Sequence, residues 1–283
     1  MPVSDRSPSL ALLGWHQFRY ENRLFWRTPA AAFFTLFFPL MFLLLFSLLF
    51  SGDPMEIAGR GSFTVTQFFA PSLAAFAAAS ATYTNIGIGT AIARDQGILK
   101  RFRGTPLPPW TYLLGRVASG VWIAAIAVVI MVAIGIVGYD LHLYPARIPA
   151  MALSFVVGTA SFAALGLALA ALAPTSDSAP AVANATILPI AFISDVFIPI
   201  SDPPGWLVAV GNVFPLKHFV RTLQDGFSPF VTSSAPEWGH IAVMAAWGIG
   251  GVLLALRFFV WEPKTSDRGP RRRRRQSGRV SSP

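Results

Sequence analysis

Apolar residues gather in six long runs that contain no Asp, Glu, Lys or Arg, and short polar segments separate these runs. A helix needs about 20 residues, at about 1.5 Å each, to cross the hydrocarbon core of a membrane. In lipid an open chain must bond its backbone polar groups within helices. The pattern therefore predicts six transmembrane helices, at about 30–51, 64–92, 112–138, 149–173, 179–199 and 238–260.

The overall composition supports a lipid environment. Of the 283 residues 54% are hydrophobic and only 12% are charged, with a formal net charge of +9. A water-soluble domain carries about 25% charged residues. The chain has no cysteine, which excludes disulfides and Cys-based metal sites, and four scattered histidines leave little catalytic chemistry. We expect an all-α integral membrane protein with no catalytic and no metal-binding residues.

The positive residues predict the orientation, because Lys and Arg remain on the cytoplasmic side of a membrane. Six spans place both termini on one side. That side holds all but four of the 22 Lys and Arg residues, so both termini are expected to be cytoplasmic. The exceptions are Arg60, Arg147, Lys217 and Arg221.

Two segments flank the transmembrane domain, which is expected at 28–261. In residues 1–27, apolar Leu12, Trp15 and Phe18 alternate with polar residues at near-helical spacing, which predicts an amphipathic helix lying at the membrane interface. An ordinary juxtamembrane aromatic and basic belt is the alternative. Residues 262–283 are rich in Arg, Ser, Gly and Pro, which predicts a disordered, basic cytoplasmic tail.

The cytoplasmic loop 93–110 is more elaborate than a connection requires. It contains Asp95, then Gly97, then a basic helical turn at Lys100 and Arg101, then a break with the sequence Thr-Pro-Leu-Pro. This order favours contact with a partner, and a simple orientation signal is the alternative. The chain contains no Gly-x-x-x-x-Gly-Lys-Ser/Thr phosphate loop, so any ATP would be bound by another chain.

At these residues the sequence resembles the permease subunits of type-2 ATP-binding-cassette (ABC) exporters, whose loop commonly reads acidic-x-Gly-Thr-Leu-basic-Arg and then Thr/Ser-Pro-Leu. Ile98 replaces the usual Thr, and Asp195 stands where the family more often has a small neutral residue. The resemblance extends over nearly the whole chain. Further matching segments are 27–29, 34–40, 188–199, 203–206 and 214–216.

The resemblance implies that the loop forms a coupling helix seated in a groove of a cytoplasmic ABC ATPase. The complex would hold two ATPase copies, which bind ATP and Mg, together with a second permease copy or a sister permease. It would lie in a bacterial cytoplasmic membrane, in contact with lipid, and bind no nucleic acid. The contact residues would be Asp95, Gly97, Leu99, Lys100, Arg101, Pro106 and Leu107.

One face of the second span mixes aromatic and hydroxyl side chains, which suits an amphiphilic solute. The resemblance implies that spans two and five line the transport path. Hydroxyls bonded to their own helix are the alternative. The substrate-path candidates are Phe76, Tyr83, Asn85, Asn184 and Thr186.

Asp195 interrupts the fifth run near the external boundary, where water can reach an ionised carboxylate. A simple boundary carboxylate and an external gate residue are both open interpretations. Beyond it, residues 201–231 contain no piece long enough to span. The resemblance implies short re-entrant helices between spans five and six, and a loop on the outer surface is the alternative.

Together these observations predict a non-catalytic permease subunit that exports a small hydrophobic, drug-like compound or a lipid with energy from a partner ATPase. The loop Ser51–Thr64 holds no extracellular domain, which favours such substrates over long polysaccharides. The alternative is an ion-coupled carrier or a passive channel. A carrier would need acidic or histidine relays inside its spans, and the sequence offers only Asp195.

Overall fold

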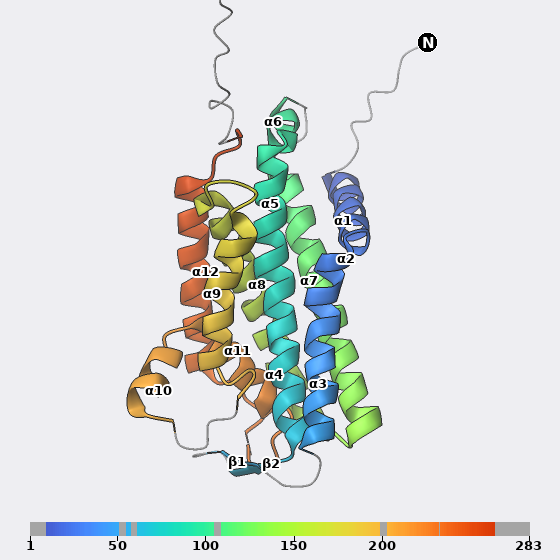
Figure 1. The fold of residues 1–283 in the computed structure, drawn as a ribbon, viewed down its shortest axis with the longest axis vertical. Helices are drawn as coiled ribbons and strands as arrows, with labels where there is room; N and C mark the ends of the chain where they lie inside the picture. The colour runs from blue at the N-terminus through green and yellow to red at the C-terminus, as the bar shows by residue number, and fades with distance from the viewer. Residues whose placement is uncertain are drawn as a thin grey trace, which may run out of the picture.

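The computed structural model describes residues 10–50, 55–57, 61–104, 109–198, 203–231 and 233–263. Long helices run side by side along the vertical axis of Figure 1, with short helices and a two-stranded hairpin at the ends. The predicted all-helical fold is confirmed. The hairpin, which the sequence reasoning did not predict, pairs Met55–Ile57 with Gly61–Phe63 in antiparallel register.

The N-terminal half contains two helical rods, each interrupted by a single π-helical segment. Pro29 begins the first rod, where its missing N–H is not needed. Thr64 and Gln67 begin the second with reciprocal side-chain-to-backbone hydrogen bonds of 3.2 and 3.0 Å. The elements are α1 (Leu10–Trp26), α2 (Pro29–Ala32), η1 (Phe33–Phe37), α3 (Phe38–Leu49), β1 (Met55–Ile57), β2 (Gly61–Phe63), α4 (Val65–Ala79), η2 (Ser80–Thr84) and α5 (Asn85–Asp95).

The rest of the described chain begins with a short helix at one end of the bundle and includes four helices of 15 or more residues. Pro145 opens the turn into α8, and two short helices precede the last long helix. The elements are α6 (Ile98–Arg103), α7 (Pro109–Tyr139), η3 (Pro145–Arg147), α8 (Ile148–Leu172), α9 (Ala179–Ile193), α10 (Gly205–Gly211), α11 (Pro215–Asp225) and α12 (Trp238–Phe258).

Within the described residues, four helical segments are long and apolar enough to cross a membrane, as expected of a multi-pass membrane protein. Their outer surfaces carry large exposed apolar side chains, such as Val137 at 88% and Leu256 at 77% exposure. The rod α4–η2–α5 is not among these four apolar segments. The apolar helix α9 is shorter than each of them. The four segments are Pro29–Leu49, Trp110–Tyr139, Pro145–Leu172 and Trp238–Phe258.

Small residues of α8 allow neighbouring helices to approach it closely. A Cβ atom on Gly166 would lie 2.7 Å from the backbone oxygen of Tyr83 in η2. On the other side, a Cβ on Gly251 of α12 would lie 2.9 Å from the backbone of Ala164. Ser161 donates a hydrogen bond of 2.7 Å to the Met244 carbonyl across the same contact. Van der Waals packing of small residues therefore holds the bundle together.

Some sequence-based expectations lie outside the described residues. These include most of the predicted disordered tail, from residue 264 onward, and the loop residues Pro106 and Leu107. The predicted N-terminal amphipathic helix corresponds to α1, which packs against α7 and exposes Trp15, Tyr20 and Trp26.

The close approach at Gly166 predicts a difference between two chemically identical substitutions. Gly166→Ala should destabilise the purified permease by about 1–3 kcal/mol, because its new methyl meets backbone that cannot move aside. Gly250→Ala on α12 meets nothing within 4 Å and should be neutral or stabilising by up to about 1 kcal/mol. Thermal unfolding in detergent measures both. Equal unfolding temperatures would contradict the assigned packing of α8.

Candidate functional site

A cavity of about 740 Å³ lies among α1, the rods α2–α3 and α4–α5, and helices α7 and α9. Apolar side chains such as Phe34, Ile86 and Leu188 form most of its wall. Three of the five predicted substrate-path residues, Phe76, Asn85 and Asn184, also line it. The fold thus brings residues from distant parts of the chain around one space of ligand size.

Asn85 and Phe76 hold two walls of the cavity in place. The Asn85 side-chain amide donates a hydrogen bond of 3.0 Å to the hydroxyl of Thr35, joining α5 to η1. Phe76 is 4% exposed and packs edge-on against Phe197, with ring centroids 5.2 Å apart. Residues of both π-helical segments of the described chain, Thr35 of η1 and Ser80 of η2, also line this cavity, and such segments often mark functional sites.

Tyr83 and Thr186 contact each other and are not among the residues that line the cavity. Their hydroxyl oxygens lie 2.6 Å apart, which joins η2 to α9. The Thr186 hydroxyl also lies 2.9 Å from the Val182 carbonyl of its own helix. Because a hydroxyl has one hydrogen to donate, the Thr186 hydroxyl that donates to Val182 accepts its second hydrogen bond from the Tyr83 hydroxyl. The hydroxyl thus bonds within its helix, as the alternative interpretation held, and also links two elements.

A buried ion pair at the cavity wall escaped the sequence reasoning, which treated Arg116 only as an orientation signal. Arg116 Nη2 lies 3.5 Å from Glu21 Oε2, and both side chains are less than 10% exposed. Arg116 also donates to the Tyr112 hydroxyl, and Gln17 donates to Glu21. Burial raises the pKa of Glu21, against the opposing effects of Arg116 and Gln17. Gly89 leaves the space that the guanidinium occupies.

The loop after α5 forms a short basic helix at the end of the bundle, beyond α5 (Figure 1). Gly97 precedes it with φ of +69°, a left-handed conformation that favours glycine. Leu99 is fully buried against Ala93 and Tyr112, and this contact fixes the helix to the bundle. Lys100 and Arg101 are exposed. The helix α6 therefore presents positive charge outward from a rigid base.

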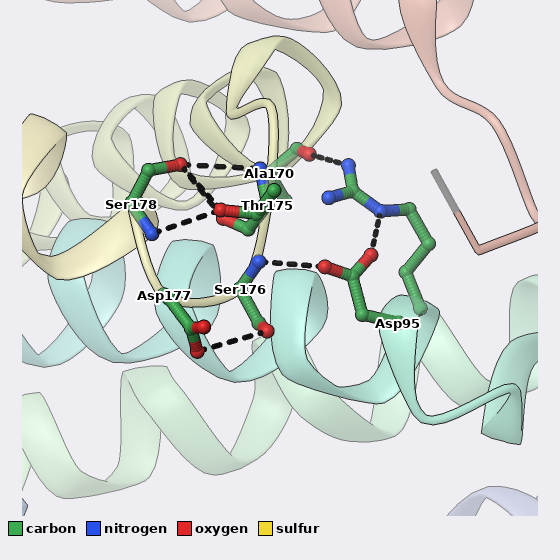
Figure 2. Close-up of polar contacts among 7 residues, drawn as sticks. Asp95, Ala170, Thr175, Ser176, Asp177 and Ser178 are labelled. Atoms are coloured by element: carbon green, nitrogen blue, oxygen red, sulfur yellow. Dashed lines mark hydrogen bonds and ion pairs between the residues drawn. The ribbon is translucent and has the colours of Figure 1, made fainter. Parts of the chain in front are cut away.

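Asp95 points toward the bundle, although the resemblance implied a contact with a partner. Its Oδ2 accepts a hydrogen bond of 2.6 Å from the backbone N–H of Ser176, in the turn between α8 and α9 (Figure 2). The side chain is only 8% exposed. Burial raises the pKa of Asp95, but hydrogen bonds from Arg94 and Ser176 together outweigh it and hold that pKa below its usual value.

Asp195, the possible external gate, forms contacts within its own chain. It follows α9 with φ of +57°. Its Oδ2 lies 3.8 Å from Lys217 Nζ and 3.9 Å from Arg221 Nη2, both on α11. One carboxylate therefore faces two cations, and it joins the end of α9 to α11.

Two of the four histidines, although far apart in the sequence, contact each other between α11 and α12. The Nδ1 atoms of His218 and His240 lie 2.6 Å apart. His218 Nε2 lies 2.8 Å from the Asn212 carbonyl, and His240 Nε2 lies 2.9 Å from a Glu237 carboxylate oxygen. Among the described residues no group of three His, Cys, Asp or Glu could hold a metal ion.

Comparison with known proteins gives a family match and two curated relatives. Residues 14–227 match the family model described as "ABC-2 type transporter". The chain is also 24% identical over 186 residues to the "Probable multidrug ABC transporter permease YbhR" of Escherichia coli strain K12, and equally to its counterpart in strain O157:H7. Each alignment covers 64% of this chain and 50% of the relative, so the chain spans about half the length of these relatives.

The family match covers the cavity, α6 and the turn between α8 and α9, which are the features described above. It agrees with the multi-pass helical bundle. This chain therefore belongs to the ABC-2 type transporter family and is a membrane permease of that family.

Proposed function

We propose that this permease exports a small hydrophobic, drug-like compound or a lipid, driven by ATP that a separate cytoplasmic ABC ATPase hydrolyses. The exposed basic helix α6, fixed to the bundle by buried Leu99, is the observation that carries the proposal. The relatives are named as multidrug ABC transporter permeases, which supports the class of substrate. This chain would supply no catalytic group, and ATP and Mg would be held by the partner.

The proposed topology has six spans and places both termini in the cytoplasm of a bacterial cell. Besides the four long apolar segments, the rod α4–η2–α5 and the helix α9 would cross the membrane. Helices α10 and α11 would dip into the outer leaflet, where packing against protein satisfies their backbone. In this topology α6 is cytoplasmic, and Asp195 lies near the outer surface.

We further propose that α6 is seated in the ATPase and that the complex contains two permeases and two ATPases. Lys100 and Arg101 are free to face carboxylates of the partner, because both side chains are exposed while Leu99 holds the helix against the bundle. In small interfaces a few residues carry most of the binding energy. Pro106 and Leu107 remain proposed contacts by resemblance alone.

The cavity supports the proposed class of substrate. Its volume of about 740 Å³ falls within the range of about 300–1,000 Å³ found for small-molecule sites. Its walls are mostly apolar, with a few polar groups such as Asn85, Asn184 and the Glu21–Arg116 pair. Such a site suits an apolar molecule with one polar end.

A second candidate function, an ion-coupled carrier, is favoured by one observation. The contact between His218 and His240, extended by Glu237, is a chain of groups that can hold and pass a proton. It lies between α11 and α12, and neither histidine lines the 740 Å³ cavity. We therefore prefer ATP-driven export, and transport without an ATPase would favour the carrier.

The coupling role of α6 predicts the effect of a charge reversal. The double variant Lys100→Glu with Arg101→Glu should lower the affinity for the ATPase by at least about tenfold, because like charges then face each other at the interface. The permease should still insert and fold, because both side chains are exposed. Co-purification of the co-expressed ATPase measures the effect.

Arg257→Glu is the control for this prediction, because Arg257 is an exposed cation in the last turn of α12. It should bind the ATPase as the unmodified chain does. Wild-type co-purification of the α6 double variant would contradict the proposed contact.

The cavity predicts a difference between two neighbouring positions of α9. Asn184→Trp should reduce binding of an apolar fluorescent dye by about tenfold or more, because the indole narrows the proposed site. Ala185→Trp should leave binding within about twofold, because exposed Ala185 does not line the cavity. Fluorescence titration of the purified variants measures both affinities. Equal dye affinities would contradict the assignment of this cavity.

A further inference from the structure

Two consecutive residues at the end of α5 join three separate parts of the fold. Asp95 Oδ1 accepts a hydrogen bond of 2.8 Å from Arg94 Nε, and its Oδ2 accepts from Ser176 N at 2.6 Å. Arg94 Nη1 donates a bond of 2.7 Å to the Ala170 carbonyl at the end of α8. The Arg94 side chain is only 2% exposed. We call this set of four residues the Asp95 clip.

The turn that receives the clip is held by its own hydrogen bonds. Thr175 N donates to Ser178 Oγ at 3.1 Å, and Ser178 N donates to Thr175 Oγ1 at 3.2 Å (Figure 2). The Val182 N–H donates to the Ser178 carbonyl at 3.0 Å, which continues the turn into α9. A displacement of Ser176 is therefore carried into α9 and is not absorbed by a loose loop.

The clip is joined just as directly to α6. Gly97 N donates to the Arg94 carbonyl at 3.0 Å, and Arg101 N donates to the Gly97 carbonyl at 3.1 Å. Only Gln96 and Gly97 separate Asp95 from the first residue of α6. Movement of α6 thus acts on α5 through the chain and on α9 through the carboxylate of Asp95.

These two helices are neighbours, and both contribute to the cavity wall. α5 contributes Asn85 and Gly89, and α9 contributes Asn184 and Leu188. Besides the clip, α5 packs against both α8 and α9, and the clip adds polar contacts to this packing at the end nearest α6. A hydrogen bond to a charged group contributes about 1.5–3 kcal/mol, enough for the Asp95–Ser176 contact to keep α6 and the turn together.

We propose that Asp95 is a positioning residue, which makes α6 and the turn between α8 and α9 move as one body, and that it does not contact the ATPase itself. The proposal rests on the proposed function, in which α6 is moved by the ATPase. It differs from the role implied by family resemblance, because the carboxylate is already bonded on both oxygens and is 8% exposed. ATP-driven movement of α6 would then reach α5 and α9 together, and both helices line the cavity.

A distance measurement tests the clip in the permease alone. The chain has no cysteine, so spin labels can be attached at Lys100→Cys on α6 and at Asp177→Cys in the turn, both exposed positions. The unmodified clip should give one narrow distance distribution. Asp95→Ala removes the acceptor and Ser176→Pro removes the donor N–H, so each should broaden the distribution. The matched control Ser176→Ala retains the N–H and should leave the distribution narrow.

Two comparisons make the result specific to the clip. Combining Asp95→Ala with Ser176→Pro should broaden the distribution no further than Asp95→Ala alone, because Asp95→Ala already removes the contact that Ser176→Pro breaks. Asp95→Asn retains one oxygen acceptor and should give an intermediate width. Unchanged distributions in both Asp95→Ala and Ser176→Pro would overturn the proposal.

The assembled complex separates this proposal from the proposed function. Asp95→Ala should still co-purify with the ATPase, while ATP hydrolysed per molecule of apolar dye exported rises about tenfold, within the usual range of coupling between sites. Loss of the ATPase from Asp95→Ala with an unchanged label distance would overturn the positioning role in favour of direct contact. If the unmodified permease binds no ATPase, the proposed function fails, and the label distances still decide whether the clip exists.

Discussion

The structure depends on one constraint, which is that backbone polar groups in hydrocarbon must bond within the chain's own helices. Helices that satisfy this constraint have little hydrophobic reason to associate in lipid, so close packing of small residues must hold them together. Gly166 against η2 and Gly251 against α8 show this packing. Buried charged groups are placed where partners are available: Arg116 lies beside Glu21, and Arg147 donates to the backbone carbonyls of Asp225 and Ser228.

The same constraint explains how motion at one end of the bundle can reach a cavity inside it. Helices are stiff, so displacement of a helix end moves the whole wall that the helix contributes. α6 is fixed to the bundle by Leu99 and is followed along the chain by α7, whose Ser119 and Gly120 also line the cavity. The Asp95 clip adds α9 to this set. A short surface helix can thus act on several walls at once.

The sequence was informative where structure is set by local pattern. Apolar runs predicted where the long helices lie. The order of Asp95, Gly97 and the basic residues indicated a basic helical turn, and the family resemblance implied a coupling helix there. Contacts between distant residues were not predictable, because no local pattern encodes them. Asp95 and Ser176 are 81 residues apart, and His218 and His240 meet only because α11 packs against α12. The hairpin strands Met55–Ile57 and Gly61–Phe63 have three residues each, too few to give a strand pattern.

The central claim, that ATP hydrolysed by a partner drives export through this permease, is tested most directly in reconstituted vesicles. The permease and the co-expressed ATPase would be placed in liposomes with all ion gradients collapsed, and movement of ethidium and of a fluorescent phospholipid would be followed. Our account predicts movement of at least one probe that requires both proteins and ATP. Movement driven by an imposed proton gradient with the permease alone, and no response to ATP, would contradict it and would favour a carrier built around His218 and His240.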